Sequence, residues 1–151
     1  MRVYLCVIDE TEEAALALRF AARRASKTGG QLHILALVEP ADFVAWAGVQ
    51  DTMEAEAKNR AEALVTSAAG TIAEESGLRP AITVRQGEGV KVVRAMLDEV
   101  PDLAALVLGA AASGAPGPLV DHFTGTGCGS LPCPVMVIPG SLSREDIDRQ
   151  S

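Results

Sequence analysis

Apolar residues are concentrated in five short runs that divide the chain. The runs cover residues 2–8, 31–38, 81–85, 103–108 and 134–138. Most of them lack the regular apolar–polar alternation of a strand that has one face in water. Continuous apolar runs of this length are typical of strands buried on both faces, as in a parallel sheet. We therefore predict five buried strands.

The segments between these runs repeat apolar residues at helical spacing. One alanine-rich stripe lies between residues 14 and 25, a longer stripe lies within residues 51–75, and a shorter one lies within residues 90–100. Acidic residues precede the first stripe and Gly29-Gly30 follows it, as expected at the two ends of a helix. Strands that alternate with helices predict one α/β domain: a five-stranded, mainly parallel sheet with helices on both faces, in a Rossmann-like arrangement.

We place this domain at residues 1–140 and interpret residues 141–151 as a polar tail. The tail follows Gly140 and holds few apolar side chains that could be buried. We therefore expect it to be frayed.

Composition narrows the function classes. The chain has 151 residues, a formal net charge of −7 and only 3% aromatic residues. This acidic balance argues against partners that need clustered cations, such as nucleic acid or an anionic membrane. No apolar run reaches the length needed to span a bilayer. The odd number of cysteines, with no Cys-x-x-Cys pair among Cys6, Cys128 and Cys133, favours free thiols in a reducing cytoplasm.

A glycine-rich segment, residues 109–129, follows the fourth apolar run directly. A buried strand that leads into such a loop can bring bare backbone N–H groups close to an anion. Glycines at positions 114, 117, 125, 127 and 129 would let the backbone approach phosphates, although a turn-rich connector explains them equally well. No Walker pattern is present, and no Lys or Arg occurs from residue 95 to residue 143, which argues against a tightly held triphosphate.

Ligands of open α/β sheets lie beyond the carboxyl ends of the strands. Asp9 closes the first predicted strand and Val38 closes the second. Asp9 could hydrogen-bond an adenine or ribose edge, or it could serve as a helix N-cap, and the two roles can coexist. Phe43 and Trp46 lie where a loop could cover a ligand or contact a partner, with core packing as the alternative.

The two histidines do not complete a catalytic set. His33 lies within an apolar run and is expected to be a hydrogen-bonded structural residue. His122 follows Asp121, but neighbouring residues on one element point apart. No nucleophile elbow or metal-ligand set is found, so a hydrolase or phosphotransferase is disfavoured.

Several segments together resemble the universal stress protein family, in family order and over the chain to about residue 140. They are Asp9-Glu10-Thr11, residues 17–21 (Ala-Leu-Arg-Phe-Ala), residues 32–38 (Leu-His-Ile-Leu-Ala-Leu-Val), Gly87, residues 106–109 (Leu-Val-Leu-Gly) and residues 132–138 (Pro-Cys-Pro-Val-Met-Val-Ile). The resemblance implies a stress-response protein that forms a homodimer through the last strand, residues 135–138. It implies at most slow ATP hydrolysis and no catalytic residues.

Members of this family that bind ATP carry Gly-x2-Gly-x9-Gly-(Ser/Thr) from the end of the fourth strand, and this chain departs from that motif. Gly109 matches the first position, but Ala112 replaces the second glycine. A shifted match, Gly114-x2-Gly117-x9-Gly127, ends in cysteine instead of a hydroxyl residue, and Gly125-Thr126 supplies the final pair at another distance.

Two hypotheses therefore stay open. In the first, the chain binds ATP or AMP through residues that the resemblance selects at the strand ends and in the glycine-rich segment. These residues are Asp9, Val38, Gly109, Gly114, Gly117, Gly125, Thr126 and Gly127. In the second, it is a dimeric interaction module that binds no nucleotide.

Overall fold

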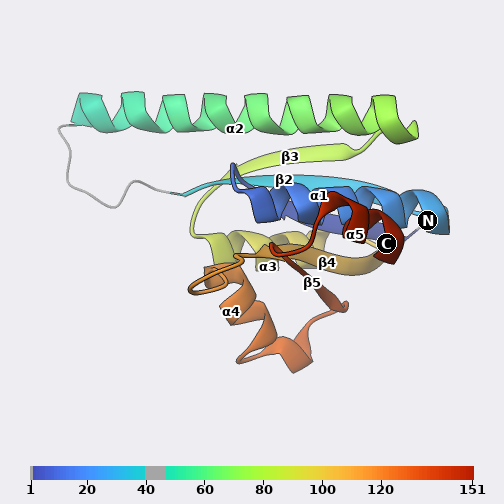
Figure 1. Cartoon of the computed structure of the whole chain (residues 1–151). Helices are drawn as coiled ribbons and strands as arrows, with labels where there is room; N and C mark the ends of the chain where they lie inside the picture. The colour runs from blue at the N-terminus through green and yellow to red at the C-terminus, as the bar shows by residue number, and fades with distance from the viewer. Residues whose placement is uncertain (1, 40–46) are drawn as a thin grey trace.

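The five predicted strands form one parallel sheet in the order β3-β2-β1-β4-β5 (Figure 1). The computed structural model describes residues 2–39 and 47–151. The strands are β1 (Val3–Ile8), β2 (Gln31–Val38), β3 (Ala81–Gln86), β4 (Leu103–Ala110) and β5 (Val135–Pro139). The helices are α1 (Glu12–Thr28), α2 (Ala47–Ser76), α3 (Gly89–Glu99), α4 (Pro118–Thr124) and α5 (Arg144–Gln150), with a 3-10 turn at Cys128–Ser130. The predicted α/β fold class is confirmed.

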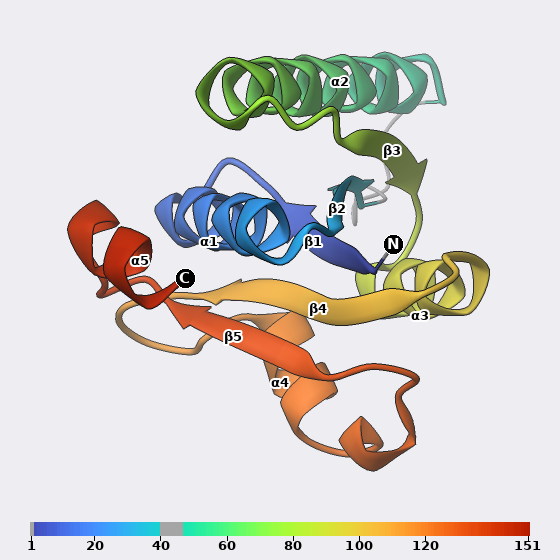
Figure 2. The same ribbon diagram turned by 90° about the vertical axis from the view of Figure 1, so that its right-hand side faces the viewer.

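The sheet carries a separate apolar core on each face. Side chains on the α1 and α2 face include Cys6, Ile34 and Val107 from the strands. The opposite face packs Leu5, Leu35 and Leu106 against α3 and α4. Neighbours such as Leu5 and Cys6 point to opposite faces, and both are fully buried. This two-sided burial is the reason that the central strands β1 and β4 read as continuous apolar runs; Figure 2 shows the helices above and below the sheet. The edge strand β3 contains no buried residue, so the prediction of five buried strands is wrong for this strand.

Helix α1 lies close to the sheet because its inner face is made of small residues. Ala17, Ala21 and Ala25 are fully buried. The N-cap is Thr11, whose hydroxyl accepts a hydrogen bond from Ala14 N at 3.2 Å. The N-cap role considered for Asp9 is therefore wrong.

Helix α2 begins at Ala47, four residues before the predicted start, and ends at Ser76. Its inner face packs Ala61, Val65 and Ile72 against the sheet, and most of its remaining described surface is exposed. No helix within residues 2–39 and 47–151 combines the length and apolarity needed to cross a membrane.

The C-terminal segment is helical, so the prediction of a frayed tail is wrong. Helix α5 begins with a capping box, in which the Ser143 hydroxyl accepts from Asp146 N and the Asp146 carboxylate accepts from Ser143 N. Ile147 is fully buried in the core on the α1 side. One buried isoleucine supplies the apolar contact that the sequence analysis did not find in this segment.

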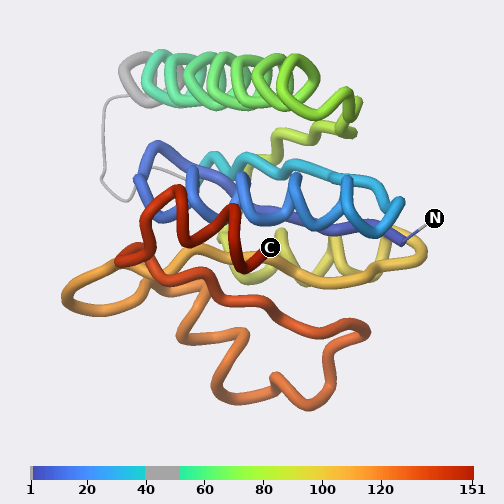
Figure 3. The backbone as a smooth tube through the Cα atoms, turned by 45° about the vertical axis from the view of Figure 1, so that its right-hand side comes forward, coloured from blue at the N-terminus to red at the C-terminus, as the bar shows by residue number. Residues whose placement is uncertain are grey.

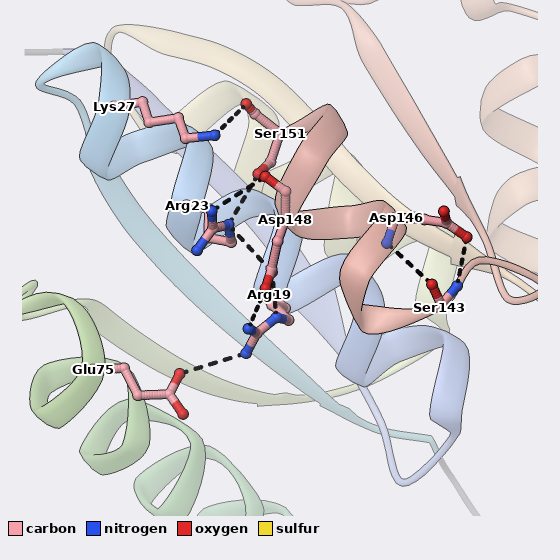
Figure 4. A network of polar contacts seen from close by, with 8 residues as sticks. All are labelled: Arg19, Arg23, Lys27, Glu75, Ser143, Asp146, Asp148 and Ser151. Carbon is pink, nitrogen blue, oxygen red and sulfur yellow. Dashed lines mark hydrogen bonds and ion pairs between the residues drawn. The ribbon is translucent and has the colours of Figure 1, made fainter.

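Polar contacts hold α5 against α1 (Figure 4). Arg19 donates from Nε and Nη2 to the two carboxylate oxygens of Asp148, at 2.7 and 2.8 Å. Arg23 donates to the Asp148 carbonyl, and Lys27 Nζ donates to the Ser151 carbonyl, each at 3.1 Å. The hydrogen bond from Arg19 lowers the pKa of Asp148 below its ordinary value. These contacts tie the end of the chain to the first helix.

Candidate functional site

A cavity of about 400 Å³ lies at the carboxyl ends of β1 and β4. Strand β1 is paired with β2 on one side and β4 on the other, so the chain order reverses at this point of the sheet. Ligands of open α/β sheets bind in the crevice at such a switch point. The β1–α1 turn and the loop before α4 reach the same edge of the sheet (Figure 3). The cavity is lined by residues from these segments and from the end of β2, among them Ile8, Asp9, Thr11, Glu13, Leu37, Glu39, Gly109 and 116–120.

Three of the predicted site residues line this cavity: Asp9, Gly109 and Gly117. Asp9 Oδ1 accepts hydrogen bonds from the backbone N and the hydroxyl of Thr11, and the N···O distance is 2.9 Å. This turn fixes the position of the carboxylate at the end of β1. Asp9 is exposed, so its polar edge is open to a ligand.

Gly109 is required for packing. A Cβ at this position would lie 2.3 Å from the Glu13 carbonyl oxygen, so only glycine lets α1 lie this close to β4. Gly117 differs, because a Cβ there would meet no atom within 4 Å. Its φ of 119° is one that other residues rarely adopt. Gly117 therefore shapes the loop before α4 and leaves open space beside it.

Val38 does not line the cavity, although both of its neighbours do. Leu37 and Glu39 are lining residues, whereas Val38 is 4% exposed and lies in the core of the α1 and α2 face. Side chains alternate along a strand, so a site that Leu37 reaches is closed to Val38.

The predicted site glycines that follow β4 lie on both sides of α4 in the sequence. Gly114 lies in the loop before this helix and is not among the lining residues. Gly125, Thr126 and Gly127 lie at and beyond the other end of α4, and none of them lines the cavity. The seven-residue helix α4 therefore separates the two groups along the chain.

The side chain of Arg94 lies close to a glycine beyond the end of α4. Nη2 of Arg94, on α3, lies 3.0 Å from the position that a Cβ atom would take on Gly127. Its Nε and Nη2 lie 3.2 and 3.1 Å from Nε2 of His122, which accepts from this guanidinium. Sequence reasoning missed Arg94, because this residue belongs to α3 and lies outside the glycine-rich segment. It directly precedes residues 95–143, which contain no Lys or Arg.

His33 takes a structural place away from the cavity. Its Nε2 lies 2.7 Å from the Thr83 hydroxyl of the neighbouring strand. Burial lowers the pKa of His33, with a smaller contribution from Arg85. These contacts agree with the expected hydrogen-bonded structural histidine.

The cavity lining is acidic. Asp9, Glu13 and Glu39 contribute carboxylates, and none of the lining residues is Lys, Arg or His. Sequence reasoning missed Glu13 and Glu39, which carry no motif and are brought to the site by the start of α1 and the end of β2. Within the part of the chain that the structure describes, no group of acidic, His or Cys side chains could hold a metal ion.

A second and larger cavity, about 940 Å³, lies over the outer side of α1 between α2 and the start of α5. It is remote from the strand ends, so the smaller cavity remains the better candidate for the predicted site. Phe43 and Trp46, the two aromatic residues considered as a cover, lie outside the described residues.

Comparison with known proteins gives one family match. The model of the universal stress protein family matches residues 1–139. Among curated proteins, no sequence matches the chain. Helix α5 lies beyond the matched range.

Solved structures with the same fold come from several organisms. A universal stress protein from Lactobacillus plantarum superposes with a TM-score of 0.77 at 18% identity, over 91% of this chain and 97% of that one. One from Archaeoglobus fulgidus in complex with dAMP has a TM-score of 0.54 at 20% identity, over 91% and 97%. A family protein from Arabidopsis thaliana with AMP bound has a TM-score of 0.56 at 15% identity, over 92% of each chain.

Proposed function

The chain belongs to the universal stress protein family, and on that basis we propose that its switch-point cavity binds the adenosine part of an adenine nucleotide. The observation that carries the proposal is the position of the cavity, between the carboxyl ends of β1 and β4 where the strand order reverses. Two proteins with this fold are described with dAMP and with AMP.

The lining suits a flat base and a sugar. Val7, Leu37 and Leu119 supply apolar surface against which an adenine ring would pack. The Asp9 carboxylate, positioned by its bonds to Thr11, would accept hydrogen bonds from ribose hydroxyls or from the adenine amino group. The open space beside Gly117 would admit the ligand next to the backbone.

Calorimetric titration with adenosine, AMP and ATP, with and without magnesium, tests the proposal. Asp9→Asn keeps the size of the side chain and its Oδ1 acceptor, and it removes the charge and one acceptor. We expect it to weaken the binding of adenosine about tenfold or more, since a hydrogen bond to a charged group contributes about 1.5–3 kcal/mol. Asp98→Asn, at an exposed position of α3, is the matched control and should bind as the unaltered protein does. Absence of saturable binding at millimolar ligand would refute the proposal.

The edge position of β5 supports the homodimer of the second hypothesis, and dimer formation is compatible with nucleotide binding. Strand β5 is the last strand of the sheet, and Val135, Met136 and Val137 are only partly buried. Apolar edge strands pair readily with another chain. We propose a homodimer formed through residues 135–138; a sedimentation coefficient that stays monomeric at all concentrations would contradict it.

The free thiols bear on location. Cys6 is buried, Cys133 is half-buried and Cys128 is exposed, and all three are unpaired. Unpaired cysteines persist in reducing compartments, so a cytoplasmic location is part of the proposal.

A further inference from the structure

Three acidic residues from separate segments of the chain line the switch-point cavity. Asp9 comes from the end of β1, Glu13 from the first turns of α1 and Glu39 from the residue after β2. The cavity lining contains no basic side chain to balance them. Any ligand in this cavity therefore meets a negative electrostatic potential.

The helix end nearest to Glu39 already holds a carboxylate of the chain itself. Glu88 caps α3, and its two oxygens accept from Val90 N at 3.1 Å and Lys91 N at 3.3 Å. Glu39 Oε1 lies 2.9 Å from the place of a Cβ on Gly89, so a second carboxylate reaches the same helix start. Two backbone amides in the first turn of α3 are thus occupied by the Glu88 carboxylate and are not free for an anion.

Helix α4, whose first residues line the cavity, offers few donors. Helix α4 begins with Pro118, which has no N–H, and has only seven residues. Helix α4 therefore offers a phosphate neither a long helix dipole nor a full set of amide donors. At the start of α1, which also lines the cavity, Ala14 N already donates to the Thr11 hydroxyl.

Among the described residues, no Lys or Arg lines the cavity to offset these carboxylates. Residues 40–46, which follow Glu39 and lie outside the described part, have the sequence Pro-Ala-Asp-Phe-Val-Ala-Trp and contain no basic side chain. On α3, Lys91 is exposed and Arg94 contacts His122, and neither of these cations lines the cavity.

From this arrangement we infer that the cavity selects its ligand by charge, and that it binds uncharged adenosine more tightly than AMP and AMP more tightly than ATP. The inference rests on the proposed function and specifies its ligand class. Each phosphate charge placed several ångströms from the three carboxylates is repelled without a compensating ion pair. At the effective dielectric constant near a protein surface, such repulsion lowers affinity by about tenfold for each added phosphate group.

Titrations without magnesium, at low and high sodium chloride, test the inference. We expect adenosine to bind with an affinity that salt does not change, AMP to bind about tenfold more weakly, and ATP more weakly again. High salt should raise the affinity for AMP and ATP, because screening weakens repulsion. Magnesium should selectively raise the affinity for ATP, because the metal neutralises the phosphates.

Glu39→Gln separates charge from shape. It should raise the affinity for AMP about three- to tenfold and leave the affinity for adenosine unchanged, which also shows that the variant is folded. Glu12→Gln is the matched control, because Glu12 neighbours Glu13 on α1 but lines the second cavity. This control should bind both ligands as the unaltered protein does.

The outcomes distinguish the two proposals. If AMP binds as tightly as adenosine or more tightly, or if salt weakens AMP binding, the inference on charge is overturned and the proposed function stands. If neither adenosine nor either nucleotide binds in any condition, the proposed function fails and the inference fails with it.

Discussion

Gly109→Ala tests whether this glycine serves the packing of α1 or the binding of a ligand. The new Cβ would lie 2.3 Å from the Glu13 carbonyl oxygen and 2.5 Å from the Glu13 carbonyl carbon. Both atoms belong to the backbone, so no side-chain rotation relieves the contact, and α1 has to move away from β4. Overpacking of this kind costs about 1–3 kcal/mol, and a rigid backbone neighbour places the cost near the upper end.

A smaller effect opposes this loss. Replacing glycine by alanine reduces the conformational entropy of the unfolded chain and stabilises the fold by about 0.4–1 kcal/mol. The net destabilisation of Gly109→Ala is therefore about 2 kcal/mol. For a chain of this size, that corresponds to a fall in Tm of about 4–8 °C.

Gly70→Ala is the control of opposite sign. Gly70 lies within α2, and a Cβ there would meet no atom within 4 Å. Alanine at this position should stabilise the helix by about 0.5–1 kcal/mol. Urea and thermal unfolding, followed by circular dichroism, would measure both variants. The packing role would be refuted if Gly109→Ala were as stable as the unaltered protein, and a stable variant that lost ligand binding would support the phosphate-loop role instead.

Three further predictions concern the C-terminal helix and the thiols. Ile147→Ala should lower the free energy of unfolding by about 2–4 kcal/mol, whereas Ile82→Ala, at a side chain that is 47% exposed, should have a much smaller effect in the same urea titration. Because Arg19 holds the pKa of Asp148 below its ordinary value of 3.8, the stability from this contact is present at neutral pH and is lost as the pH falls below about 3.8; Asp148→Asn should remove that part of the dependence of the urea midpoint on pH. Burial raises the pKa of the Cys6 thiol, so mass spectrometry after brief alkylation should find the exposed Cys128 modified, and Cys6 should react only in denaturant; equal modification of both would contradict the described burial.

The sequence alone determined the architecture of this protein. Strands that are covered on both faces are apolar at nearly every position, and the helices between them carry one apolar stripe. Both patterns can be recognised in the sequence without coordinates. The family resemblance could be read as well, because its segments keep their order along the chain. Asp9, Gly109 and Gly117, which the sequence offered as nucleotide-binding residues, do line the cavity, and their role in binding stays a prediction.

The tertiary structure alone decided which side chains face the cavity. Val38 was excluded because alternation along β2 turns it into the core, and Glu39 was brought in by the same alternation. Gly117 and Gly125 lie at opposite ends of the seven-residue helix α4. Arg94 reached Gly127 from another helix. Local periodicity reports whether a residue is buried, whereas the charge of a site depends on residues that are distant in sequence and meet only when the helices pack on the sheet.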